Sequence, residues 1–352
     1  MSPLHRNQRP RPRDSQIAGL PAQSWLRSWS YALRTTNPPP DARLDMVTRW
    51  LVVSRAAVLP MTVIAGLLAA LLAIGEPTLD WRWLTLAIIG ITLAHIANNL
   101  MNDLYDTQAG TDTTSYPRAL YAPHPVLSGL VSRHTLVTAI LVVNAADLAV
   151  LAVLTWARGW PVVVFAVAGF VLSVAYTAPP LRLKKRGLGE ADVLVVWGPL
   201  MVCGTYFSAV GSVGWHVLLA SVPYGVLCTT VLMGKHIDKI PYDQPLGIRT
   251  LPVILGSTRA RAATLGLMVG FYLLVAVAVL VGALPWPALL VVLAVPRLIK
   301  NWKYFRRPPP AHPPKGFPVW PLWYAALAWI HVRQAGALLV VGLAVGAVLR
   351  AL

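Results

Sequence analysis

The sequence predicts an all-α membrane protein that crosses the bilayer nine times. Of its 352 residues, 56% are hydrophobic and only 12% are charged, whereas soluble domains average roughly 25% charged residues. The apolar residues come in runs of about 20, which is the length of a helix that crosses a hydrocarbon core of about 30 Å. Composition alone therefore excludes an ordinary soluble domain.

Nine apolar segments follow one another along the chain. They cover residues 56–75, 83–103, 135–157, 161–178, 190–212, 215–235, 261–283, 285–303 and 334–351. Very short turns separate the third segment from the fourth and the fifth from the sixth. Each of these two pairs is therefore expected to form an antiparallel hairpin.

The formal net charge of +17 could suggest a nucleic-acid partner, but the distribution of the charge along the chain indicates membrane topology instead. With the N-terminus inside, nearly all Lys and Arg fall in the N-terminal tail and the even-numbered loops, and the outside segments hold only Arg82, Arg158 and Arg350. Positive residues accumulate on the cytoplasmic side of membrane proteins. We therefore expect a multi-pass protein of the plasma (inner) membrane, with its N-terminus inside, its C-terminus outside and anionic lipid bilayer as a partner.

The chain consists of two regions that differ in composition. Residues 1–45 are rich in Pro and Arg and contain no apolar stretch of a signal peptide, so most of this tail is expected to be disordered. Within it, residues 24–31 place Trp25 and Trp29 four residues apart, the spacing of a short helix on a membrane surface. Residues 46–352 are expected to form the transmembrane domain.

The first of two acidic segments follows the second predicted span, at residues 98–112. Asn98, Asn102 and Asp106 are four residues apart and would share one helix face, with Asp103 and Asp112 nearby. Oxygen ligands of this kind suit Mg²⁺, which usually takes one or two carboxylates plus substrate phosphate. Helix capping would explain two of these residues, but not the whole concentration in a chain with only 13 Asp and Glu residues.

The second acidic segment follows the sixth predicted span and holds Asp238 and Asp243 among the cations Lys235, Lys239 and Arg249. Four spans separate the two segments, so the chain resembles two similar four-helix halves plus one further helix. Each half would bring an acidic helix end to a shared cytoplasmic mouth, a known arrangement in membrane proteins with internal repeats. A solvated loop of mixed charge is the alternative for this segment.

Three motifs together resemble the UbiA superfamily of intramembrane prenyltransferases, over essentially residues 50–352. They read Asn102-Asp103-x-x-Asp106-x-x-x-Gly110-x-Asp112, then Tyr176-Thr177-x-Pro179-Pro180 leading to Arg186-Gly187-Leu188-Gly189-Glu190, then Asp243-x-x-x-Gly247-x-Arg249-Thr250-Leu251-Pro252. The resemblance implies nine transmembrane helices around a central cavity. It also implies two Asp-rich motifs whose Mg²⁺ ions bridge to a prenyl diphosphate.

The match to the family's metal motifs is uneven. Asn102, Asp106 and Asp112 match the first motif, and Asp243 matches the last aspartate of the second. In the similar branch, which prenylates dihydroxynaphthoate in menaquinone synthesis, an aspartate stands where this chain has Lys239. Asp238 is displaced from that position by one residue, a rotation of about 100° on a helix. The sequence leaves open whether Asp238 binds metal or Lys239 contacts the diphosphate.

The function implied by the resemblance is Mg²⁺-dependent transfer of a prenyl group from a prenyl diphosphate to a lipophilic or aromatic acceptor, in quinone biosynthesis. The expected catalytic residues are Asp103, Asp106, Lys239 and Asp243. Cationic donors must stabilise the charge that develops on the diphosphate. The candidates are Arg55, Arg118, Lys184, Lys185, Arg186, Lys235, Lys239 and Arg249, although topology would explain any single one of them.

An aromatic face can stabilise the allylic cation, and Tyr176 is a candidate for this role, although interfacial belts explain most aromatic residues. Asp147, near the middle of the third span, is either functional or a protonated or paired structural residue. Two further functions remain open. A membrane terpene cyclase would share the ionisation centre but need no acceptor, and a transporter would use a midplane ion site.

Overall fold

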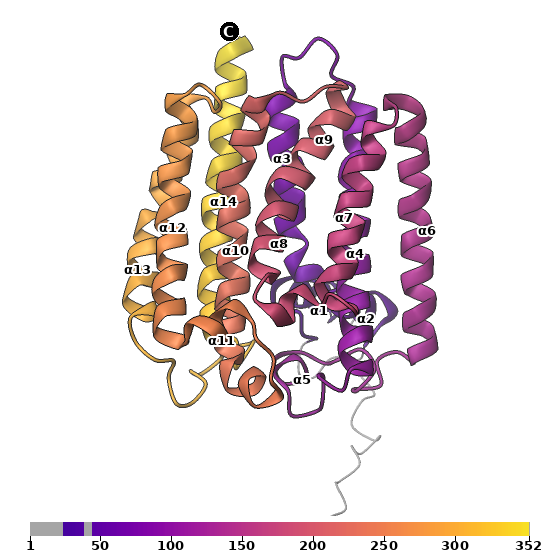
Figure 1. Cartoon of the computed structure of the whole chain (residues 1–352), viewed down its shortest axis with the longest axis vertical. Coiled ribbons are helices and arrows are strands. Elements are labelled where there is room, and N and C mark those ends of the chain that lie inside the picture. The colour runs from indigo at the N-terminus through magenta and orange to yellow at the C-terminus, as the bar shows by residue number, and fades with distance from the viewer. Residues whose placement is uncertain (1–23, 39–43, 352) are drawn as a thin grey trace, which may run out of the picture.

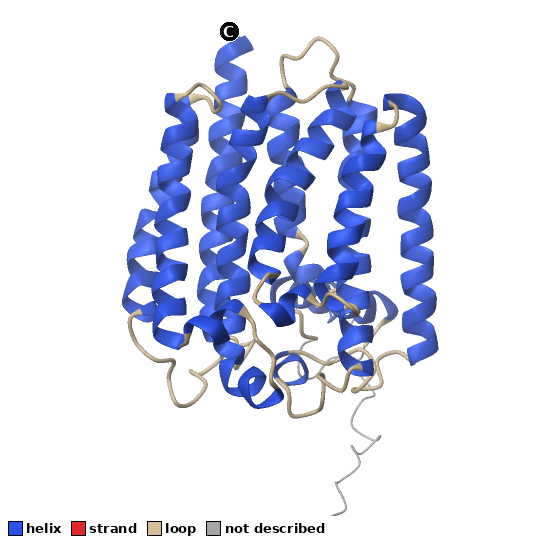
Figure 2. Ribbon diagram, in the orientation of Figure 1, coloured by secondary structure: helices blue, strands red, loops and turns tan. Residues whose placement is uncertain are grey.

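The computed structural model describes residues 24–38 and 44–351, and throughout these ranges its regular structure is helical (Figure 2). Among these residues, seven helices are long and apolar enough to span a membrane. The predicted class, an all-α polytopic membrane protein, is confirmed. Backbone amides cannot be satisfied by lipid, so helices that bond internally are one of the few architectures available.

The seven spanning segments are Ala56–Ala73, Trp81–Gln108, Arg133–Arg158, Gly189–Val210, Trp215–Leu246, Ser257–Leu280 and Trp323–Arg350. The long helices in them are α3 (Pro60–Ala73), α4 (Trp81–Gln108), α6 (Arg133–Arg158), α10 (Trp215–Asp243), α12 (Ser257–Leu280) and α14 (Trp323–Ala351), and the span Gly189–Val210 joins α8 (Gly189–Val195), a π-helical stretch η4 (Val196–Leu200) and α9 (Met201–Val210).

The described part of the structure contains ten further helical elements. They are α1 (Ser24–Thr35), α2 (Met46–Val53), η2 (Ala56–Val58), α5 (Pro117–Tyr121), α7 (Pro161–Thr177), η3 (Leu183–Arg186), η5 (Gln244–Leu246), α11 (Leu251–Leu255), η6 (Trp286–Ala294) and α13 (Val295–Phe305). All nine predicted spans are therefore helical. However, the fourth is the short helix α7 and the eighth divides into η6 and α13, so nine membrane crossings remain a prediction.

Local sequence explains where several helices start and turn. The Asp80 carboxylate accepts a hydrogen bond from the Arg82 amide at the start of α4, and Ser132 accepts one from the Thr135 amide at the start of α6, which are N-caps. The predicted hairpins turn at Gly159, between α6 and α7, and at Gly211, between α9 and α10. Both glycines have positive φ, a conformation that glycine adopts without strain.

Helix α10 packs against α8, α12 and α14 (Figure 1). Close approach depends on glycine: a β-carbon at Gly225 would lie 2.4 Å from the Leu194 carbonyl oxygen, and one at Gly234 would lie 2.7 Å from the Tyr324 backbone. In the same core, the hydroxyl of the buried Tyr224 donates a hydrogen bond to the Met61 carbonyl at 2.7 Å. These contacts fix the helix that carries the second acidic segment.

The short elements α1, α2, α5 and α11 lie at the end of the bundle opposite the C-terminus (Figure 1). The Trp29 indole donates to Asp45 at 3.0 Å, and the Asn37 amide donates to the Tyr121 carbonyl at 2.8 Å. These bonds attach α1 to this end of the bundle. The disorder predicted for the tail concerns mainly residues 1–23 and 39–43, which lie outside the described residues.

Candidate active site

The candidate site lies at the C-terminal ends of α4 and α10, next to the loop that follows each helix and the loop between α7 and α8. Residues 98–108 of the first acidic segment form the C-terminal end of α4. The Lys184 ammonium lies 2.5 Å from both the Asn102 Oδ1 and the Asp106 Oδ2 atoms. Lys185 Nζ lies 3.8 Å from Asp106 Oδ1 and donates to the Thr111 hydroxyl at 2.6 Å. Two lysines therefore face the amide–carboxylate pair of α4.

Burial changes the acid–base behaviour of these lysines. It lowers the pKa of both Lys184 and Lys185 below the ordinary lysine value, and attraction to Asp106 opposes this effect. Lys239 also lies near enough to lower both pKa values. The site thus gathers several cations whose mutual repulsion favours an anionic ligand.

The turn after α4 places Asp112 close to Asp106. The amides of Thr111 and Asp112 donate to the Asp106 carbonyl at 2.9 and 3.1 Å, and Gly110 has positive φ. The Asp112 carboxylate lies 3.3 Å from His124 Nε2. Asn102, Asp106 and Asp112 therefore occupy one region, as the first motif predicts.

Asp243 comes from α10 and is fully buried. Its Oδ1 accepts a hydrogen bond from the Tyr116 hydroxyl at 2.5 Å and lies 3.5 Å from the Lys239 ammonium. Burial and then the charges of Asp243, Asp106 and Asp112 raise the pKa of Tyr116 above the ordinary tyrosine value. Tyr116 therefore remains a neutral donor between carboxylates that come from both acidic segments.

Asp103 has a different environment from its neighbours. It is fully buried; Arg118 donates to both of its oxygens at 2.8 and 2.9 Å, and Arg55 also pairs with it. His124 Nε2 is 3.9 Å away. Asp103 therefore holds two arginines beside the site, and its catalytic role stays a prediction.

Asp238, whose role as a metal ligand the sequence leaves open, contacts the start of α14 in the structure. Its carboxylate turns away from Asp243 and accepts hydrogen bonds from the Tyr324 and Ala325 amides, at 3.0 and 2.9 Å, at the start of α14. It is an N-terminal cap for that helix. Lys239, one residue later, faces the site instead and lies 4.8 Å from the centre of the Tyr116 ring.

The other predicted diphosphate contacts divide into two groups. Arg186 and Arg249 are exposed, and Arg186 donates to the Pro180 carbonyl at 2.9 Å, so neither side chain is placed in the buried cluster. Lys235 lines the cavity next to the cluster, as does Tyr176, the candidate for stabilising the allylic cation. Lys184 Nζ lies 5.6 Å from the Tyr176 ring centre. Glu190, the last residue of the Arg186–Glu190 motif, pairs with His236 Nδ1 at 2.6 Å.

A divalent cation fits the chemistry of this cluster. Asp106 Oδ1 and Asp243 Oδ2 are buried and have no hydrogen-bond partner among the described residues. Ligand atoms of Asp103, Asp112 and His124 also lie within 4.8 Å of one another, but Asp103 is already neutralised by its arginines. Oxygen donors with free lone pairs are the ligands that Mg²⁺ prefers, which favours Asn102, Asp106, Asp112 and Asp243.

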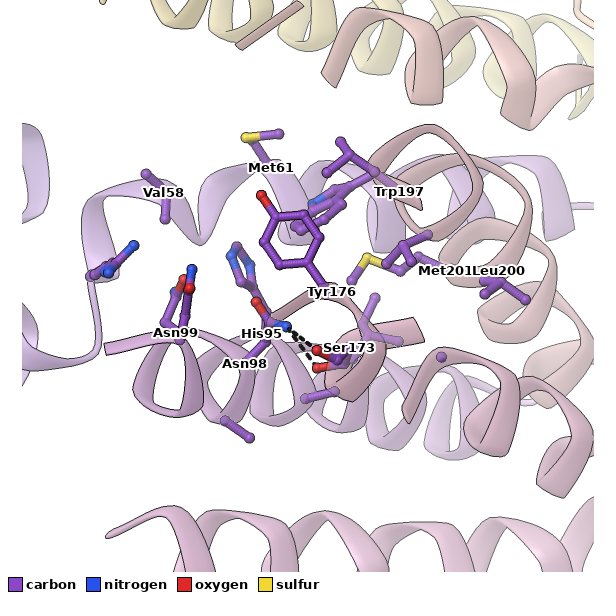
Figure 3. Close-up of a pocket in the computed structure, with 18 of the residues that line it drawn as sticks. Val58, Met61, His95, Asn98, Asn99, Ser173, Tyr176, Trp197, Leu200 and Met201 are labelled. Carbon is purple, nitrogen blue, oxygen red and sulfur yellow. Dashed lines mark hydrogen bonds between the residues drawn. The ribbon is translucent and has the colours of Figure 1, made fainter. Parts of the chain in front are cut away.

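A cavity of about 850 Å³ extends from this cluster into the bundle. Figure 3 shows part of its lining, where Met61, Tyr176 and Trp197 surround the polar residues His95 and Asn98. His95 Nδ1 lies 2.7 Å from the Thr62 hydroxyl, and the Asn98 amide donates to Ser173 Oγ at 2.7 Å. The lining is otherwise mostly apolar, so an isoprenoid chain and an aromatic ring both suit this space.

The chain belongs to the UbiA prenyltransferase family, whose sequence profile matches residues 59–327. Solved structures share the fold. A UbiA homolog from Aeropyrum pernix has a TM-score of 0.56 at 17% identity, over 88% of this chain and 100% of that chain. A UbiA homolog from Archaeoglobus fulgidus, bound to DMAPP and Mg²⁺, has a TM-score of 0.51 at 15% identity, over 83% of this chain and 99% of that chain.

Curated relatives include prenyltransferases of naphthoquinone synthesis. The Haemophilus influenzae 1,4-dihydroxy-2-naphthoate octaprenyltransferase is 31% identical over 62% of this chain and 72% of its own length. The Escherichia coli enzyme of the same name is 26% identical over 76% and 88%. The Synechocystis 2-carboxy-1,4-naphthoquinone phytyltransferase is 28% identical over 56% of this chain and 62% of its own length, so the match spans about three fifths of that relative.

Proposed function

We propose that the protein transfers a prenyl group from a prenyl diphosphate to an aromatic acceptor of quinone biosynthesis, in a Mg²⁺-dependent reaction within the membrane. One observation carries the proposal: buried carboxylates of α4 and α10 meet several cations at one end of a largely apolar cavity. A polar end suits a diphosphate, and the apolar remainder suits the prenyl chain and acceptor.

The proposed metal ligands are Asn102, Asp106 and Asp112 from the first segment and Asp243 from the second. When bound, Mg²⁺ would neutralise the negative charge of the diphosphate leaving group. Lys184, Lys185 and Lys239 lie next to these carboxylates, so their ammonium groups would bind the diphosphate oxygens beside the metal. Arg55 and Arg118, held by Asp103, add fixed positive charge.

The cavity has two roles in this proposal. It excludes water from the allylic cation that forms when the C–O bond to diphosphate breaks, and it binds the prenyl chain, each buried CH₂ contributing about 0.8 kcal/mol. Tyr176, whose ring lies between the lysine cluster and the cavity, would face this cation. The names of the relatives support a hydroxylated naphthoate as acceptor. The asymmetric distribution of Lys and Arg supports a cytoplasmic location of the site.

The test uses purified protein in lipid nanodiscs with Mg²⁺, prenyl diphosphates of several lengths and 1,4-dihydroxy-2-naphthoate. The expected result is a prenylated naphthalene product, identified by mass spectrometry, that Asp106→Asn does not form. A cyclic hydrocarbon made from the diphosphate alone would indicate a terpene cyclase instead. Transport of the diphosphate across the bilayer of sealed vesicles, with no chemical product, would indicate a transporter.

A further inference from the structure

Two acidic residues in the described part of the chain have no hydrogen bond or ion pair, Asp147 and Asp192, and both line the large cavity. Every other described acidic side chain has a partner, such as Tyr206 for Glu76 or His236 for Glu190. Asp192 is the more buried of the two, with 7% of its surface exposed, and its Oδ1 is inaccessible to solvent and unpartnered.

Asp192 lies close to the reacting end of the cavity. It belongs to α8, and three residues before it a β-carbon at Gly189 would lie 3.1 Å from the Tyr176 ring and 2.9 Å from the Lys184 backbone. Residues three apart share a helix face. Asp192 therefore lies on the face of α8 that packs against Tyr176. The residues that come next in the chain, Val193, Val196 and Trp197, also line the cavity.

A buried carboxylate without a partner is costly in an apolar environment, and such groups are usually explained by function. The diphosphate end already has its own carboxylates, each matched to a cation or a donor. Lys235, from α10, also lines the cavity without a hydrogen bond or ion pair in the described part of the chain. A carboxyl group and a lysine amine, both without a partner in one cavity, suit an occupant that has both a donor hydroxyl and an anionic group.

We propose that Asp192 binds the aromatic acceptor, accepting a hydrogen bond from its hydroxyl group and acting as the base that takes the hydroxyl proton. This inference rests on the proposed function and adds the residue that binds the aromatic substrate in the same cavity. It also specifies the substrate class: a hydroxylated aromatic ring, with Lys235 able to pair with a carboxylate on that ring.

In the proposed reaction, the attacking carbon of the aromatic ring bears a hydrogen atom. The O–H bond breaks and the proton moves to Asp192, while a C–C bond forms between the ring and the prenyl C1 atom. The C1–O bond breaks and its electron pair leaves with the diphosphate. The ring carbon then loses its hydrogen as a proton to the diphosphate, and the oxygen recovers its own proton from Asp192. General-base catalysis of this kind typically contributes 10²–10⁴-fold in rate, to order of magnitude.

Two substitutions separate the binding and base roles of Asp192. Asp192→Asn keeps an oxygen that accepts a hydrogen bond but removes the base, so kcat is expected to fall by about 100-fold or more with little change in the KM of the acceptor. Asp192→Leu also removes the oxygen that accepts the hydrogen bond. The competitive ligands 1-hydroxy-2-naphthoate and 1-methoxy-2-naphthoate then provide a direct probe, because only the first can donate a hydrogen bond.

The wild-type protein is expected to bind the hydroxy ligand at least about tenfold more tightly than the methoxy ligand. In Asp192→Leu this ratio should approach one, while the dissociation constant for the prenyl diphosphate stays at the wild-type value and shows that the variant is folded. Asp147→Leu is the matched control, a carboxylate from α6 in the same cavity, and should keep the wild-type ratio.

An unchanged ratio in Asp192→Leu, or a ratio lost only in Asp147→Leu, would overturn the assignment of Asp192. Wild-type kcat in Asp192→Asn would overturn its role as base. Failure of the wild-type protein to prenylate any hydroxylated aromatic acceptor is a different outcome, because it would contradict the proposed function itself.

Discussion

Tyr116 and Asp243 are 127 positions apart, yet the Tyr116 hydroxyl donates a hydrogen bond to Asp243 Oδ1 at 2.5 Å. The contact joins the loop after α4 to the C-terminal end of α10. It therefore connects the two acidic segments, which approach each other only in the folded chain, and leaves the second Asp243 oxygen unpartnered among the described atoms. We regard this bond as the feature that orients Asp243 in the site.

Tyr116→Phe tests this relationship. It removes one hydrogen bond to a charged group, an interaction worth about 1.5–3 kcal/mol, while the ring remains to pack beside Lys239. We expect kcat/KM for the prenyl diphosphate to fall about 10–100-fold with little change in thermal stability. Tyr105→Phe, on the same helix as Asp106 and without a side-chain hydrogen bond in the described structure, is the control and should retain wild-type activity.

Lys184 and Lys185 are expected to differ in importance. Lys184 contacts both Asn102 and Asp106 at 2.5 Å, whereas Lys185 is 3.8 Å from Asp106. Lys184→Met should weaken diphosphate binding at least about tenfold, and Lys185→Met by a smaller factor, because close charged contacts are stronger than separated ones. Binding of a non-hydrolysable diphosphate analogue by calorimetry measures both effects. Equal losses in the two variants would contradict the assigned order.

Asp238 and Lys239 should have opposite phenotypes although they are adjacent. Asp238→Ala removes the cap of α14 and should lower the free energy of unfolding by about 0.5–2 kcal/mol, with activity per folded molecule preserved. Lys239→Ala should lower activity with little effect on stability. Thermal unfolding in detergent and initial rates on the same samples separate the two effects. An inactive but stable Asp238→Ala variant would contradict the capping role of Asp238.

These two residues also show how far the sequence could predict the site. The apolar runs indicated the helical segments because membrane insertion depends on length and hydropathy, and the four-residue spacing of Asn102 and Asp106 predicted their shared face. Neither rule orients a helix end, where one residue changes direction by about 100°. The role of Asp238 depends on the start of α14, whose bonded amides lie 86 and 87 residues later. The role of Tyr116 depends on a loop with no periodic pattern.

Asp103 is predicted to support structure more than chemistry. It is fully buried between Arg55 and Arg118, and removing one partner of a buried ionic group typically costs about 3–5 kcal/mol. Asp103→Ala should therefore reduce the yield of folded protein and its melting temperature, measured by fluorescence-detected size exclusion. Asp106→Ala should not reduce either quantity to the same extent, because its partner Lys184 keeps a hydrogen bond to Asn102.

The most direct test of the central claim, that α4 and α10 together form one Mg²⁺–diphosphate centre, is the initial rate of prenyl transfer as a function of Mg²⁺ concentration. Wild-type protein should be inactive in excess EDTA and show saturable activation by Mg²⁺. Asp106→Ala and Asp243→Ala, one from each helix, should each lose at least about 100-fold in rate, to order of magnitude. Full activity in EDTA, or wild-type rates and Mg²⁺ dependence in either variant, would contradict the claim.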